Sequence, residues 1–293
     1  MKQFRSQFNL ICGSVLLLSA AIQGKTDLGD APDSTNHLNR FMTAYAAGHT
    51  GLPQSIPGNF PTVYDDGSGT GPYGPVHLND EIVAYLGTRI TREIEADTGP
   101  DEDGRNNLKV EMAGSAANHD NGDDTFDVKI PISLPKCCWT TLDYKVTVVD
   151  PSVDLWVNIW FDWNRDGDWD DVVDCTEGPA PEWAVQNQLL FNLPVGLNTI
   201  TSKAFRPWHP DDIEHIWIRI TLSDKPWKTG SNPGELGNGG SGPQEKYLFG
   251  ETEDYYVIPA NPLCCMCKDH DGDGDVDMDD LVYYSDMWLI ECP

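Results

Sequence analysis

Residues 155–161 read LWVNIWF, in which four aliphatic or phenyl side chains alternate with Trp156, Asn158 and Trp160. Because successive side chains of a strand point to opposite faces, this period of two predicts a β-strand with an apolar face. Residues 216–222 read IWIRITL and repeat the pattern, with Trp217 on the second face. These two stretches predict a mainly β fold.

The same periodicity extends outward from these two stretches. Further strands are predicted at residues 126–134, 144–148, 188–193, 199–205 and 253–258, with a short additional one at 82–86. Clusters of Gly, Pro and Asn separate them, and no helical pattern lies between them. About seven strands joined by turns predict an antiparallel β-sandwich over residues 125–258. Residues 22–124 are rich in Gly, Pro, Asn and Asp and are expected to form an irregular N-terminal extension.

The first 21 residues have the pattern of a secretory signal peptide. Lys2 and Arg5 precede the apolar run Leu10–Ile22, and small residues at 19–21, near the end of that run, provide a cleavage site. The run is too short for a permanent membrane helix, and no later segment of the sequence resembles a membrane span. The sequence therefore predicts a secreted protein, extracellular or on the cell surface.

The charge is strongly negative, with 47 Asp and Glu against 19 Lys and Arg and a formal net charge of −28. A phosphate backbone would repel such a surface, which excludes nucleic-acid binding through a basic face.

After a linker at residues 259–262, the acids of the tail are spaced as in a twelve-residue calcium loop. Gly274 stands where the sharp turn requires glycine, and an apolar helical face follows from Leu281. We expect residues 263–293 to form a small calcium loop–helix module. Its predicted ligands are Asp269, Asp271, Asp273, Asp275, Asp277 and Asp280.

A second acidic turn follows the strand at 155–161 directly. Its predicted oxygen ligands are Asp162, Asn164, Asp166, Asp168 and Asp170. Gly167 occupies the turn position, but Val173 stands where the closing carboxylate of a calcium loop belongs. We expect Glu253 or Asp254 to complete a Ca²⁺ site. The alternative is a tight solvated turn without an ion.

Seven of the eight cysteines lie beyond the predicted signal peptide, and an exported protein is expected to pair them as disulfides. Cys175 is expected to pair with Cys137 or Cys138. Cys292 is expected to pair with a cysteine just before the tail loop, the candidates being Cys264, Cys265 and Cys267. An odd count leaves one thiol free or paired between chains.

Several short motifs resemble those of the GEVED domain. They include LGDAPDS at 28–34, WIRITLS at 217–223 and GETEDYYV at 250–257, where Thr252 replaces the usual Val. The resemblance spans about residues 27–258 and implies a β-sandwich module of large exported bacterial surface proteins, without an established activity. The tail resembles one repeat of a type I dockerin, whereas dockerins ordinarily carry two and dock onto a cohesin. This pairing of segments is similar to planctomycete secreted proteins. With one repeat present, the resemblance carries over the calcium site but not cohesin docking, and the candidate partners are a cohesin-like or envelope protein and a polysaccharide.

We expect no catalysis, because the sequence contains neither an HExxH nor a GxSxG motif. The expected function is that of a secreted calcium-binding surface or assembly module. The alternative is a carbohydrate-binding module, or an accessory part of an extracellular polysaccharide-degrading system, with sugars stacked on Trp156, Trp160 and Trp217. The competing interpretation of these tryptophans is a second buried face beneath the N-terminal extension.

Overall fold

The computed structural model describes residues 27–34, 42–48, 54–62, 73–90, 123–127, 131–210, 214–228 and 239–260. The described part is built from β-strands. They are β1 (Thr43–Tyr45), β2 (Ile56–Pro57), β3 (Ala84–Leu86), β4 (Asp143–Val148), β5 (Leu155–Phe161), β6 (Val172–Cys175), β7 (Gly178–Pro181), β8 (Trp183–Leu190), β9 (Gly196–Thr201), β10 (Ile216–Ser223) and β11 (Gly250–Val257). Within these residues there is no helix long and apolar enough to cross a membrane.

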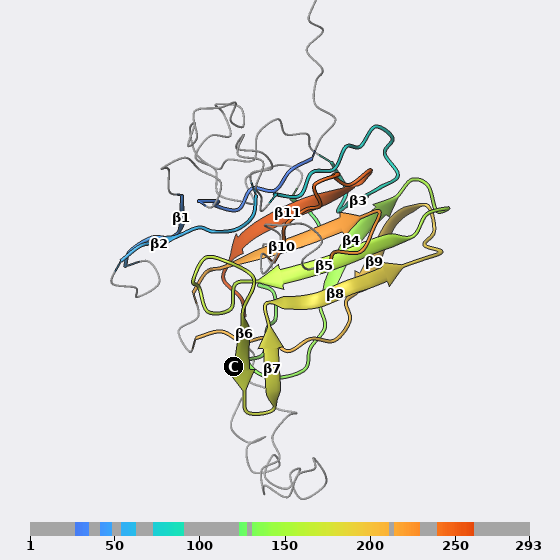
Figure 1. Cartoon of the computed structure of the whole chain (residues 1–293). Helices are drawn as coiled ribbons and strands as arrows, with labels where there is room; N and C mark the ends of the chain where they lie inside the picture. Colours follow the sequence, from blue (N-terminus) through green and yellow to red (C-terminus); the bar gives the residue numbers. More distant parts are fainter. Residues whose placement is uncertain are drawn as a thin grey trace, which may run out of the picture.

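Two antiparallel sheets form the sandwich. One contains four strands in the order β11-β10-β5-β8, and the other contains three in the order β3-β4-β9. Figure 1 shows them as two stacked layers. The aliphatic face of β5 and the face of β10 that carries Ile218 and Ile220 pack with Tyr144 and Val146 of β4 in one buried cluster. The predicted mainly β fold is confirmed.

The opposite face of the four-stranded sheet is also buried. Segments from the N-terminal part cover it, and Figure 1 shows β1 and β2 beside this sheet. The covering side chains pack with the sheet in a second cluster, whose fully buried members include Tyr45, Phe60, Trp160, Trp169 and Trp217. As a result β10 is buried at every position. The N-terminal part is therefore a layer of the domain.

Strand β11 is joined to the N-terminal segments by side-chain hydrogen bonds. The amide of Thr252 donates to Asp27 Oδ2 over 2.8 Å. Asp254 Oδ2 accepts from the amides of Asp30 and Ala31 at 2.7 and 2.8 Å. These contacts fix the first described segment of the chain against the last described strand.

Some predicted strands are displaced or absent. The strand predicted at 188–193 lies at Trp183–Leu190, and the one at 199–205 lies at Gly196–Thr201. The prediction of a strand at 126–134 is wrong for the described residues of that range, where only Ser133 forms an isolated bridge, to Ala260. Pro131 and Pro135 explain this, since neither has an amide hydrogen to donate to a ladder.

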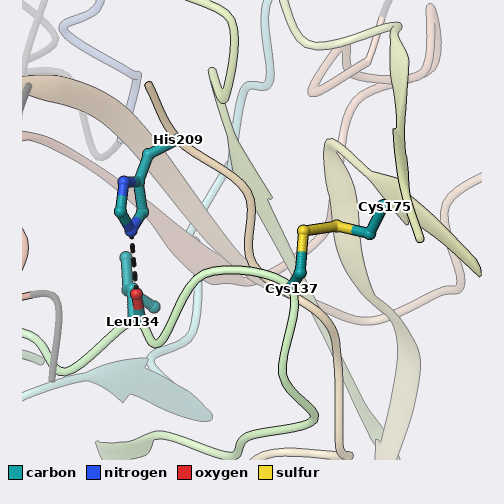
Figure 2. The surroundings of a disulfide bond; sticks show 4 residues. All are labelled: Leu134, Cys137, Cys175 and His209. Carbon is teal, nitrogen blue, oxygen red and sulfur yellow. Dashed lines mark hydrogen bonds between the residues drawn. A yellow bond between two sulfur atoms is a disulfide. The ribbon is translucent and has the colours of Figure 1, made fainter. Parts of the chain in front are cut away.

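The hairpin β6–β7 was not predicted, and it is held at its turn by a disulfide between Cys175 and Cys137. Figure 2 shows the loop with Cys137 beside the strand with Cys175. Leu134 lies in the same loop as Cys137, and its carbonyl oxygen is 3.1 Å from Nε2 of His209, which lies between β9 and β10. The expected pairing of Cys175 with Cys137 or Cys138 is thus confirmed as Cys137.

Candidate metal centre

The acidic turn begins where β5 ends, and its first carboxylate is buried. The amide of Asp162 donates to the carbonyl of Trp217 at 3.0 Å, which continues the pairing of β5 with β10. Tyr45 of β1 donates its hydroxyl to Asp162 Oδ2 at 2.9 Å and accepts from the Trp217 amide at 3.1 Å. The N-terminal layer therefore helps to set the orientation of Asp162.

The backbone of the turn wraps around the Asp162 side chain. The amides of Asp166 and Gly167 donate to its two carboxylate oxygens at 3.2 and 3.0 Å. Gly167 has a φ of 95°, and a side chain there would meet the Pro57 carbonyl oxygen at 2.3 Å. The glycine is required both by this backbone conformation and by the close approach of the N-terminal layer.

A further carboxylate beside the acidic turn belongs to Glu182, which the sequence reasoning missed. Glu182 lies between β7 and β8, and its amide donates to the Asp171 carbonyl at 2.9 Å where the hairpin begins. The hairpin therefore returns the chain to the acidic turn. The carboxylate oxygens of Glu182 accept from the amides of Trp163 and Asp171 at 2.9 and 3.1 Å.

Asp162, Asp166 and Glu182 each offer an oxygen, and these three oxygens all lie within 4.8 Å of one another. Asp162 and Glu182 are buried, whereas Asp166 is exposed, so the cluster is open to solvent on one side. No described Lys or Arg forms an ion pair with any of the three. Among the described residues, the carboxyls of the cluster therefore lack a cationic ion-pair partner.

Burial and mutual repulsion raise the pKa of every carboxyl in the cluster. Burial raises the pKa of Glu182 to about 10, with a further contribution from the charge of Asp162. The pKa of Asp162 is raised by burial and by Asp166. Burial and the charge of Asp168 raise the pKa of Asp166 to about 6. An ionised cluster of this kind needs a cation, and a multivalent ion coordinated by oxygens would reverse these shifts.

Two neighbouring acids extend the cluster. Burial also raises the pKa of Asp168 to about 6, and the pKa of Asp170 is raised by burial and by Asp171. Asn164 donates its amide to Asp166 and Asp171 at 2.9 and 2.6 Å. The turn thus gathers the acids that the sequence predicted as ligands.

The two remote candidates have other partners, which corrects the expectation that one of them closes the shell. Asp254 forms a buried pair with Arg219, whose Nε and Nη2 donate at 2.7 and 2.6 Å. Glu253 accepts from the Tyr255 hydroxyl at 2.6 Å and from the amide of Thr125 at 3.2 Å. The third carboxylate that lies beside Asp162 and Asp166 is Glu182, and neither Glu253 nor Asp254 belongs to that group.

The tryptophans predicted as a sugar-stacking face do not form one. Trp160 and Trp217 are only 1% and 3% exposed because the N-terminal layer covers them, while Trp156 is partly exposed. The indole NH of Trp217 donates to the carbonyl of Ala44 in that layer. The interpretation of these residues as a second buried face is confirmed for Trp160 and Trp217.

The predicted tail loop, with Asp269 to Asp280, lies outside the described residues. So do the predicted signal peptide and the cysteines at 264, 265, 267 and 292.

Comparison with known proteins gives one match. Residues 156–258 match the GEVED domain, which covers the later part of the region over which the sequence resembles that family. The matched residues include the acidic turn, Glu182 and all of β11. No curated protein and no solved structure matches the chain.

Proposed function

We propose that this chain is a secreted, non-catalytic surface or assembly module whose β-sandwich is stabilised by calcium bound between the acidic turn and Glu182. The observation that carries the proposal is the position of Glu182. The DxNxDG turn at residues 162–167 lacks the closing acid of a calcium loop. The carboxylate of Glu182, which follows the β6–β7 hairpin, lies beside this turn. A solvated turn would not require a second buried carboxylate beside the first.

The donor set favours calcium over other common metals. Every candidate ligand is an oxygen, and Ca²⁺ takes six to eight oxygens with flexible geometry. Asp162, Asn164, Asp166, Glu182 and the Asp168 carbonyl would supply most of these, with Asp170 and water for the rest. Zinc sites usually contain Cys or His, and neither is among these residues.

The tail and the N-terminus supply the rest of the proposal, on sequence grounds. The basic and apolar start of the chain supports secretion. The acidic tail loop supports a second calcium site in a dockerin-like module, which would attach the sandwich to a cohesin-like or envelope protein. In this arrangement the sandwich site stabilises the domain and the tail provides attachment.

The test is thermal unfolding of the full mature chain with and without calcium, in an Asp273→Ala background that disables the tail loop. We expect calcium to raise the melting temperature, since an ion that binds only the folded state at 100 times its Kd stabilises by about 2.7 kcal/mol. Glu182→Gln should remove most of that increase. Asp174→Asn, an exposed change on the same hairpin, is the matched control and should keep it.

The calcium-free state gives a second, opposite signature. Glu182→Gln removes a buried, repelled carboxyl, so its stability without calcium should equal or exceed that of the parent protein. A variant that is destabilised equally with and without calcium would show that Glu182 serves only as a hydrogen-bond acceptor. That result would refute the metal site.

A further inference from the structure

Trp139 and Arg206 form an exposed aromatic–cation pair on the side of the molecule that carries the disulfide. Two antiparallel segments hold the pair: Thr140 bridges Phe205, and the Cys137 amide donates to the Pro207 carbonyl at 2.8 Å. The guanidinium carbon of Arg206 lies 4.7 Å from the centre of the Trp139 ring.

Trp139 is 61% exposed, and it is the only tryptophan among the described residues that is classed as exposed. The others that the structure describes lie in the two cores or are partly covered. An indole with most of its surface in water contributes little to stability through burial. We therefore favour a role in stacking against a ligand over a role in packing the core.

Arg206 is only 7% exposed, yet its Nε has no hydrogen-bond partner. No hydrogen bond or ion pair of its guanidinium occurs among the described residues, and Trp139 is the group stacked on it. The guanidinium packs beneath the β6–β7 turn, where a side chain at Gly178 would meet Nη1 at 2.7 Å.

Arg219 shows how the same fold satisfies a fully buried guanidinium. Its guanidinium donates to both oxygens of Asp254, to Thr62 and to the carbonyls of Pro61 and Gly240. Buried polar groups are usually paired in native proteins, so a mostly buried guanidinium with no acceptor among the described residues favours an acceptor from outside. Although the chain has 47 acidic residues, none of those that the structure describes forms an ion pair with Arg206.

The two segments are rigidly supported, so that the pair is preorganised. The disulfide Cys137–Cys175 and the contact of His209 with the Leu134 carbonyl hold the loop that leads to Trp139 (Figure 2). The amide of Leu134 also donates to the Ala260 carbonyl at 2.8 Å. A preorganised platform loses less entropy when it binds a ligand.

We infer that Trp139 and Arg206 form a binding site for an acidic oligosaccharide, in which the exposed indole contacts a sugar ring and Arg206 holds a carboxylate of the same saccharide. The aromatic face favours a ring over an extended peptide, and the unpaired guanidinium favours a carboxylate over a neutral hydroxyl. This inference is independent of the calcium proposal. It places a carbohydrate site on a different surface from the buried Trp160 and Trp217.

The probe is trigalacturonate, measured by isothermal titration calorimetry on the full mature chain with calcium present. The net charge of −28 repels polyanions at long range. A short probe at about 0.15 M salt keeps that repulsion screened. We expect trigalacturonate to bind at least tenfold more tightly than neutral galactotriose. Trp139→Ala and Arg206→Met should each weaken binding at least tenfold.

Phe191→Ala, an equally exposed aromatic on the β8–β9 loop, is the matched control and should bind as the parent protein does. Arg206→Met removes no hydrogen bond within the described residues, so its melting temperature should not fall, which separates lost binding from lost folding. Equal affinity for the charged and neutral sugars, or an unchanged affinity in either variant, would overturn the inference. Equally tight binding of a hexaglutamate peptide would also overturn it, by assigning the pair to a protein partner.

Discussion

The carboxylate of Asp254 joins three parts of the chain at one buried point. It accepts from Arg219 of β10 and from the amides of Asp30 and Ala31 in the N-terminal layer. Removing it would leave the buried guanidinium without a counter-charge and the two amides without this acceptor. Leaving one member of a buried ion pair without its partner destabilises the folded state by far more than the intact pair stabilises it.

We therefore predict that Asp254→Ala lowers the free energy of unfolding by about 3–5 kcal/mol. Asp254→Asn retains an acceptor oxygen and should lose less. Urea denaturation in calcium measures both, and Asp143→Ala, an exposed change on β4, should stay within about 1 kcal/mol of the parent protein. A loss below about 1 kcal/mol for Asp254→Ala would show that the pair is dispensable.

His77 makes stability depend on pH. Burial lowers the pKa of its imidazole to about 3, and its Nε2 contacts the Thr252 hydroxyl at 2.9 Å. In the unfolded chain the pKa is about 6.5, so between pH 6.5 and 3 only the unfolded state takes up the proton. The contribution of neutral His77 is therefore present above pH 6.5 and is lost as the pH falls.

At pH 5 this effect should reduce stability by about 2 kcal/mol relative to pH 7. The other acids also titrate, so the measurement is the difference in unfolding free energy between the parent protein and His77→Gln as a function of pH. Parallel pH curves for the two proteins would contradict the prediction.

At the scale of elements, the strands with strict alternation were predictable and the irregular ones were not. The bounds of β5 match the prediction, and those of β10 differ by one residue, because one face of each strand is an unbroken row of apolar side chains. The prediction at 126–134 followed the same alternation but ignored Pro131 and Pro135. Alternation of apolar and polar residues indicates which side chains are buried. Pairing of a strand with its neighbour also requires backbone N–H groups that can donate hydrogen bonds.

The candidate site was half predictable for a related reason. The spacing of Asp162, Asn164 and Asp166 is local and was visible in the sequence. Glu182 was missed because β8 was predicted to begin at 188 and the hairpin β6–β7 contains Pro179 and Pro181. With β8 placed at its observed start, antiparallel pairing with β5 would have put Glu182 opposite the beginning of the acidic turn.

The disulfide should be the main external tether of that hairpin. The double variant Cys137→Ala, Cys175→Ala opens a loop of sequence separation 38. The chain-entropy estimate for such a loop is about 4 kcal/mol of lost stability. Calcium affinity should also fall, since Glu182 follows the hairpin directly. Denaturation and calcium titration of this variant test both expectations, and unchanged values in both would contradict them.

The charge of the whole molecule adds a dependence on salt. With a net charge of −28, the acidic side chains repel one another more strongly in the compact folded state than in the expanded unfolded state. Without calcium, raising sodium chloride from 0.05 to 0.5 M should therefore increase the melting temperature, by roughly 2–4 °C for about 1 kcal/mol of relieved repulsion. The increase should be smaller with calcium bound. Choline chloride should act alike, and an effect confined to sodium would instead indicate specific ion binding.

The contacts between β11 and the first described residues also govern how the domain folds. The hydrogen bonds from Asp30 and Ala31 to Asp254, and from Thr252 to Asp27, join residues 223 to 225 positions apart. The entropy cost of closing so long a loop must be met before these hydrogen bonds can stabilise the fold. Folds with many contacts between residues distant in sequence therefore form slowly. The N-terminal layer has no β11 to bind until almost the whole sandwich has been synthesised. The domain therefore completes its folding only after residue 257 is available, so the nascent chain stays incompletely folded through most of its synthesis.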